Sequence, residues 1–122
     1  MNIALWIVAG LLALAFFVAG LAKILTPREG LREKGMTYVE DFSDGQIKAI
    51  GGLELLGALG LIVPAFIGSI SWLVAVAASG LAVTMIGAIV VHIRRKEPFA
   101  PALVLGVLAA AVAVGRFWIA PF

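Results

Sequence analysis

The sequence predicts an all-α protein, a polytopic membrane four-helix bundle, and three observations carry this prediction. Hydrophobic residues make up 63% of the 122 residues and charged residues 13%, whereas a soluble domain has roughly 45–50% and 25%. The mean hydropathy is +1.15. The apolar residues form four long runs without the period-two alternation of strands, and in lipid only helices or closed barrels satisfy every backbone group.

The four runs leave room for a single domain, residues 1–122, because a spanning helix takes about 20 residues. The first run ends at Thr26 and Pro27, since proline stops a helix, and Pro64 lies near the end of the second. The alternative for the first run is a cleaved secretory signal, but it has no basic leading segment and exceeds the usual length of roughly 7–15 apolar residues. We therefore expect spans at residues 3–25, 46–63, 70–93 and 101–118.

One extended polar loop separates the first two spans, from residue 28 to residue 44. Its charges are of both signs, which is more typical of a solvated face than of a binding site. Residues 27–34 are expected to form a short amphipathic helix at the membrane interface, with Leu31 facing lipid. Ser43 or Asp44 is expected to cap the second span, because a side-chain oxygen there can accept a hydrogen bond from the first turn.

The counts of a few residue types restrict the chemistry. The chain has no cysteine and one histidine, so one copy has no thiolate for a metal or iron–sulfur site and cannot give two histidines to a haem. We expect no metal site and no evident cofactor, but quinone binding needs no such ligands and stays open. Nucleic acid is not an expected partner, because membrane topology explains the basic loops. With no room for a soluble catalytic domain, the isolated chain is expected to have no catalytic activity.

The distribution of basic residues predicts the orientation in a cell membrane. Cytoplasmic loops are enriched in lysine and arginine, and tryptophan collects at the membrane interfaces. Only Arg116 is expected at the opposite end, together with the three tryptophans. We expect a multi-pass protein with both termini outside and with loops 26–45 and 94–100 in the cytoplasm. The basic residues on the expected cytoplasmic side are Lys23, Arg28, Arg32, Lys34, Lys48, Arg94, Arg95 and Lys96, and the tryptophans are Trp6, Trp72 and Trp118.

Three polar side chains, Lys23, Glu54 and His92, interrupt the apolar runs in the expected cytoplasmic half. A charged group at the bilayer centre costs roughly 2.5–3.5 kcal/mol on insertion scales, so each is a candidate ligand-binding residue. With Thr84 they are expected to form an inward-facing polar cluster, because small residues that allow close helix approach share their faces. Leu61 is expected to face lipid. The small residues expected at helix contacts are Gly20, Gly51, Gly57, Ala58, Gly80 and Ala88.

These polar residues also have a simpler, structural interpretation. Lys23 and His92 are close enough to the interface to extend their polar ends to it, as lysine routinely does. Glu54 is too deep and too short for this, so its carboxyl group is paired, protonated or facing a cavity. An ion pair with Lys23 that fixes the helix register is one alternative, and a ligand site is the other. Both interpretations stay open at this point.

The chain resembles the DoxX-like family of small membrane proteins over essentially its whole length. The resemblance rests on three segments in order, residues 17–24 (FVAGLAKI), 51–61 (GGLELLGALGL) and 91–94 (VHIR). It implies a four-helix membrane protein. The association that gives the family its name implies a link to a membrane quinone oxidoreductase, and related proteins look like accessory or assembly factors.

Three functional hypotheses follow. The first is an accessory subunit of a membrane redox complex, linked to quinone, with a pocket for a lipophilic molecule near Glu54 and His92. The second is a noncatalytic assembly factor that offers its small-residue helix faces to a partner. The third is a small proton-coupled carrier that uses Glu54. The expected partners are the lipid bilayer and either another membrane protein or further copies of the chain.

Overall fold

Helices make up nearly the whole of the computed structural model, which describes residues 2–122 apart from the side chain of Arg28. No strand occurs in this range. Four helices are long and apolar enough to cross a membrane, and the predicted all-α four-helix bundle is confirmed. They are α1 (Asn2–Leu25), α3 (Asp44–Ile62, continued by the 3₁₀ turn Val63–Phe66), α4 (Leu73–Arg94) and α5 (Ala100–Val114, continued by the π-helical turn Gly115–Ile119).

Local structure moves the starts of two helices away from the expected spans. α3 begins at Asp44 rather than at residue 46, because Ser43 and Gln46 cap it reciprocally. The Gln46 N–H donates to Ser43 Oγ at 3.1 Å, and the Ser43 N–H donates to Gln46 Oε1 at 2.9 Å. Two otherwise unpaired donors are thereby satisfied. α4 begins at Leu73 rather than at residue 70, because the 3₁₀ turn Gly68–Ile70 precedes it.

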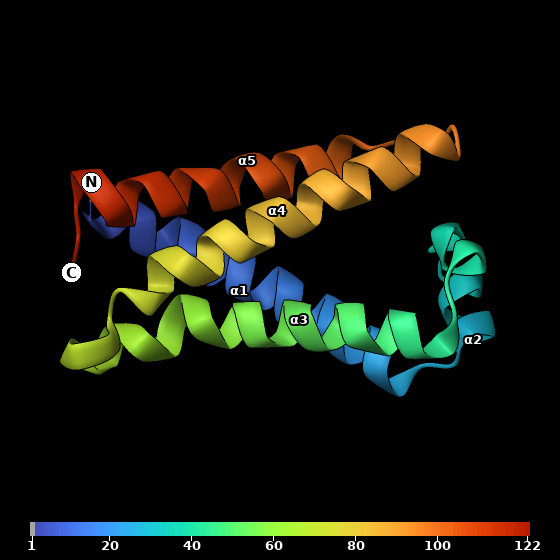
Figure 1. The fold of residues 1–122 in the computed structure, drawn as a ribbon, viewed down its shortest axis with the longest axis horizontal. Helices are drawn as coiled ribbons and strands as arrows, with labels where there is room; N and C mark the ends of the chain where they lie inside the picture. Colours follow the sequence, from blue (N-terminus) through green and yellow to red (C-terminus); the bar gives the residue numbers. More distant parts are fainter. Residues whose placement is uncertain (1) are drawn as a thin grey trace.

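The four long helices form two packed pairs that run up and down the bundle (Figure 1). α1 packs mainly against α3, α4 packs mainly against α5, and the contact between α3 and α4 joins the pairs. The N-terminal end of α1, the C-terminus and the α3–α4 connection lie at one end of the bundle. The polar loop after α1 and the turn between α4 and α5 lie at the other. We call these the terminal end and the loop end.

Glycines set the closest helix contacts. A Cβ added to Gly20 of α1 would lie 2.7 Å from the Gly51 carbonyl oxygen of α3, so the two backbones touch there. A Cβ on Gly57 would lie 2.5 Å from Leu81 Cδ2 of α4. Ala58 is buried in the central core, beside these contacts along α3. Small residues therefore bring both α1 and α4 close to α3, as van der Waals packing in a membrane favours.

The expected inward row on α4 is only partly correct. Gly80 is exposed, and no atom lies within 4 Å of the place where its Cβ would be. Thr84 is half-buried, and its hydroxyl donates to the Gly80 carbonyl of its own helix at 2.8 Å. Ala88 packs against the edge of the core. The reason is geometric: residues four apart turn by about 40° around an α-helix, so the row that starts at Gly80 drifts by about 120° before it reaches His92.

Two leucines expected to face lipid are buried instead. Leu61 is 1% exposed and belongs to the central core, because it lies on the same side of α3 as Ala58. Leu31 is 0% exposed and packs with Val39 and Ile47. The polar loop, with α2 (Arg28–Glu33) and the 3₁₀ turn η1 (Thr37–Asp41), folds back onto the start of α3 and so covers Leu31.

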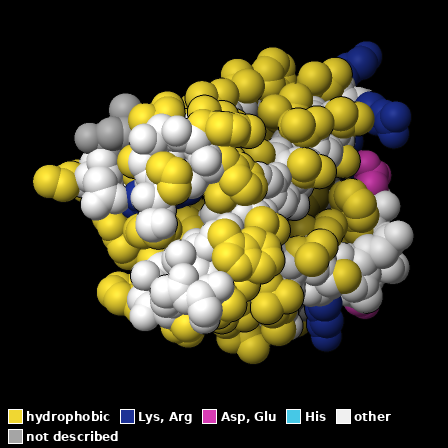
Figure 2. Space-filling model, turned by 60° about the vertical axis from the view of Figure 1, so that its left-hand side comes forward, with side chains coloured by type: hydrophobic (Ala, Val, Ile, Leu, Met, Phe, Trp, Pro, Cys, Tyr) yellow, Lys and Arg dark blue, Asp and Glu magenta, His cyan; other side chains and the backbone are white. Residues whose placement is uncertain are grey.

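The outer surface of the bundle is apolar between its two ends. Large aliphatic side chains point outward from the long helices, among them Ile7, Leu56 and Val83. Figure 2 shows hydrophobic side chains over the middle of one face, with most of the visible charges gathered at its edge. This arrangement is consistent with a bilayer around the middle of the bundle and water at both ends.

Candidate functional site

Lys23 and Glu54 form a buried ion pair between α1 and α3. The distance from Lys23 Nζ to Glu54 Oε1 is 2.5 Å, and the two side chains are 7% and 4% exposed. A buried charge is tolerated when an opposite charge and a hydrogen bond compensate it. Glu54 therefore has the partner that its depth requires, and the Lys23 side chain points to Glu54 rather than to solvent.

The contact between Gly20 and Gly51 brings α1 and α3 close enough together for this ion pair to form. The Cβ of Lys23 lies 2.8 Å from the position that a Cβ on Gly51 would occupy. A larger residue at position 51 would push α1 away from α3, and the ammonium group could no longer reach the carboxylate one turn further along. Close backbone packing and charge compensation thus depend on each other at this crossing.

Tyr38 connects this pair to His92. The phenol ring comes from η1 in the polar loop, and its centroid lies 5.9 Å from Lys23 Nζ, within the range of a cation–π contact. The His92 ring packs edge-on against the Tyr38 ring, with ring centroids 5.4 Å apart and ring planes at 81°. Tyr38 is the only tyrosine in the chain. Its place in the only extended polar loop is the signal from which sequence reasoning could have found it.

His92 pairs with a carboxylate outside the expected cluster. Its Nδ1 lies 3.3 Å from Glu97 Oε1, in the turn that follows α4. Glu54 instead faces Lys23. The expected cluster is therefore divided into two, the Lys23–Glu54 pair and the His92–Glu97 pair, with Tyr38 between them. The Thr84 hydroxyl donates to neither pair; it donates to a carbonyl of its own helix instead.

Glu97 also anchors the polar loop to the end of α4. Thr37 Oγ1 donates a hydrogen bond to Glu97 Oε2, and Arg95 Nε donates to the same oxygen at 3.2 Å. The hydrogen bond from Thr37 is the main reason that the pKa of Glu97 lies below its ordinary value, and Arg95 and His92 act in the same direction. Arg95 Nη1 lies 2.9 Å from Asp41 Oδ1, and these bonds raise the pKa of Arg95. Loop and turn are held together electrostatically.

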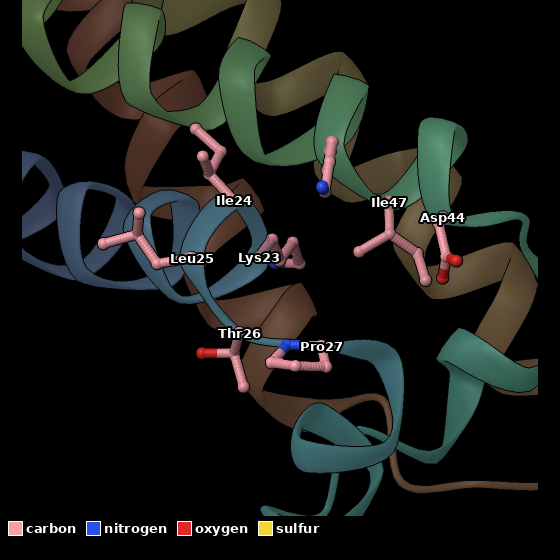
Figure 3. A pocket seen from close by; sticks show the side chains of 8 residues that line it. Lys23, Ile24, Leu25, Thr26, Pro27, Asp44 and Ile47 are labelled. Atoms are coloured by element: carbon pink, nitrogen blue, oxygen red, sulfur yellow. The ribbon is translucent and has the colours of Figure 1, made fainter.

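A hollow of about 280 Å³ opens beside the Lys23–Glu54 pair at the loop end. Figure 3 shows Lys23 on one side of it, at the end of α1, and Ile47 and Asp44 on the other, at the start of α3. Glu54, His92 and Thr84 do not line it. We call it the loop-end hollow, and its lining residues are Lys23, Ile24, Leu25, Thr26, Pro27, Asp44, Ile47 and Lys48.

Arg116 is a third buried charged residue, at the terminal end, and sequence reasoning treated it only as an indicator of topology. It is 5% exposed. Its Nη1 donates to Asn2 Oδ1 at 2.5 Å and to the Ala120 carbonyl at 2.9 Å, and its guanidinium carbon lies 3.9 Å from the Phe122 ring centroid. The side chain therefore ties the start of α1 to the residues after α5.

The comparison with protein families decides the identity of this four-helix arrangement. The model of the DoxX-like family matches residues 7–114, from the first turns of α1 to the end of α5. The chain belongs to the DoxX-like family. With its four apolar helices, this DoxX-like protein is a small integral membrane protein. No match was found among curated proteins or among solved structures.

Proposed function

We propose that this DoxX-like protein is an accessory subunit of a membrane redox complex and binds a quinone at the loop-end hollow. The observation that carries the proposal is the position of Lys23, whose buried side chain forms part of the wall of a hollow of about 280 Å³. This volume is near the lower end of the range for small-molecule sites, roughly 300–1,000 Å³. It suits a ring-sized head group.

The donor chemistry of Lys23 supports this choice of ligand. An ammonium group has three N–H donors, and Glu54 accepts one of them. The pairing fixes the direction of the ammonium group, and a remaining N–H donor would be available to a carbonyl oxygen. A bound quinone would supply the redox chemistry, and the chain itself would supply position and hydrogen bonds. Lys48 would add a second donor at the edge of the same hollow.

The proposed orientation puts the loop end in the cytoplasm and both termini outside. The polar loop, the turn after α4 and the adjoining helix ends hold every lysine and arginine in the sequence except Arg116. The positive-inside rule assigns such an end to the cytoplasm. The proposed quinone site would then face the cytoplasmic leaflet.

Binding to the purified protein in lipid nanodiscs tests the quinone proposal. The probe is a benzoquinone with a decyl tail, and native mass spectrometry reports the bound fraction. The wild-type chain should retain the probe, and Lys23→Met combined with Glu54→Gln should lose it, because the donor is gone without leaving an unpaired charge. The matched control, Arg32→Met with Glu40→Gln, removes an exposed ion pair at the same end and should bind like wild type. Equal retention by all three proteins would refute the proposal.

Co-purification tests the accessory role. The tagged chain should bring down a flavin- or haem-containing oxidoreductase from its native membranes, identified by the absorbance spectrum of the eluate. An assembly factor would instead associate only with partly assembled subunits and would tolerate Glu54→Gln. Proton uptake by liposomes that contain the chain alone would favour the carrier.

A further inference from the structure

A second hollow lies between α1 and α3, nearer the middle of the bundle. Its volume is about 360 Å³, and its lining has no charged residue. Ala13, Leu14 and Phe17 form its α1 side, and Leu59 and Ile62 lie on its α3 side. We call it the apolar groove. Leu14, Phe17 and Leu59 are exposed, so the groove opens toward lipid.

The apolar groove and the loop-end hollow lie along the same faces of the two helices. On α1, Leu14 in the groove and Leu25 in the hollow are eleven residues apart. On α3, the same spacing separates Lys48 in the hollow from Leu59 in the groove. Eleven residues make just over three full turns of an α-helix, so such residues differ in direction by only about 20°. The two hollows therefore follow each other along one side of the α1–α3 pair.

The spacing between the hollows suits a single elongated molecule. At about 1.5 Å per residue, the six to eleven residues that separate them on α1 correspond to about 9–16 Å. Between the hollows, the backbones of α1 and α3 touch at Gly20 and Gly51, so a molecule that occupied both hollows would pass over the outer side of this contact. The polar lysines are confined to one end of this path and apolar side chains to the other.

We propose that the two hollows form one binding site for an isoprenoid quinone, with its head in the loop-end hollow and its tail in the apolar groove. This inference rests on the proposed quinone function and assigns the tail. The loop-end hollow takes a ring but not a long chain, so the chain has to leave it. The apolar groove continues the same helix faces, and the lysines next to the head and the uncharged lining next to the tail match the two parts of the ligand.

Filling the apolar groove tests this assignment. Leu59→Trp adds bulk to the groove wall, whereas Leu53→Trp makes the same change on a different face of the same helix, outside both hollows. Leu14→Trp and Leu11→Trp form the corresponding pair on α1, and all four leucines are exposed, so every variant should fold. Two probes are compared in nanodiscs by native mass spectrometry, the decyl-tailed benzoquinone and a benzoquinone without a tail.

Leu59→Trp and Leu14→Trp should weaken binding of the tailed probe by about tenfold or more and leave the tailless probe unaffected. The two control variants should bind both probes like wild type. If the groove variants bind the tailed probe normally while Lys23→Met with Glu54→Gln loses both probes, the tail assignment is wrong and the quinone function survives. If wild type binds neither probe, both proposals fail.

Discussion

Lys23 of α1 and Glu54 of α3 meet at 2.5 Å directly beside the contact between Gly20 and Gly51. The ion pair and the glycine contact are therefore parts of one helix crossing. The glycines bring the backbones close enough for the short carboxylate to be reached. In return, the pair compensates two charges that would each be costly in the membrane interior.

Removing one member of this pair should cost more stability than removing both. Glu54→Gln leaves the Lys23 charge buried without its counter-ion, and breaking a buried pair in this way costs about 3–5 kcal/mol. Glu54→Gln with Lys23→Met removes both charges and should lose less. A double-mutant cycle on unfolding in detergent measures the coupling. Effects that add within about 0.5 kcal/mol would mean that the two residues do not interact.

Gly20→Ala should destabilise the bundle more than Gly57→Ala. The new methyl at position 20 meets the backbone of α3 at 2.7 Å and 3.0 Å, whereas at position 57 it meets the flexible end of the Leu81 side chain. Overpacking costs about 1–3 kcal/mol, and a side chain gives way more easily than a helix. Gly10→Ala is the control on α1, because nothing lies within 4 Å of its Cβ. Thermal unfolding in detergent gives the order, and equal melting temperatures for all three variants would contradict it.

The attachment of the polar loop to Glu97 should weaken in acid. The hydrogen bond from Thr37 lowers the pKa of Glu97 in the folded protein. The contact therefore stabilises the loop fully above the ordinary carboxyl pKa of about 4.3, and this stabilisation is lost as the pH falls through the lower, folded pKa. The protection of the loop amides against hydrogen exchange, relative to the intrinsic rate at each pH, should fall in that acidic range and stay constant from there to neutral pH.

Thr37→Val identifies the source of this pH dependence. Without the hydroxyl donor, the pKa of Glu97 should move back toward its ordinary value, and the loop should open at a higher pH than in wild type. A side-chain NMR titration of Glu97 measures the change directly. Ser69→Ala, at the other end of the bundle, is the control and should leave the titration unaltered. An unchanged Glu97 titration in Thr37→Val would remove the proposed role of the hydroxyl group.

Single cysteines can determine the membrane orientation, because the chain has no cysteine of its own. Lys34→Cys lies at an exposed position in the polar loop, and Gly68→Cys lies at an exposed position between α3 and α4. In intact cells, an impermeant thiol reagent should label the cysteine at position 68 and not the one at position 34. Both should react after the cells are opened, which controls for access. Labelling at position 34 alone would invert the proposed orientation.

The sequence was sufficient for the class of structure and for the location of its helices. A spanning helix is a local feature, since about 20 consecutive apolar residues specify it wherever the rest of the chain lies. Local chemistry also predicted the cap at Ser43, although only the geometry chose it over Asp44. The depth of Glu54 in α3 indicated that it needed a partner, and Lys23 was one of the candidates.

Tertiary structure decided which groups meet. His92 pairs with Glu97 because the turn after α4 brings that carboxylate back toward the helix, and Tyr38 reaches Lys23 because the polar loop folds onto the bundle. Gly80 points outward because its row drifts around α4 as the helix turns. Each result depends on how distant segments are placed and rotated relative to one another. Hydrophobicity along the chain determines that helices form in the membrane, but their crossing and the path of the loop determine the site.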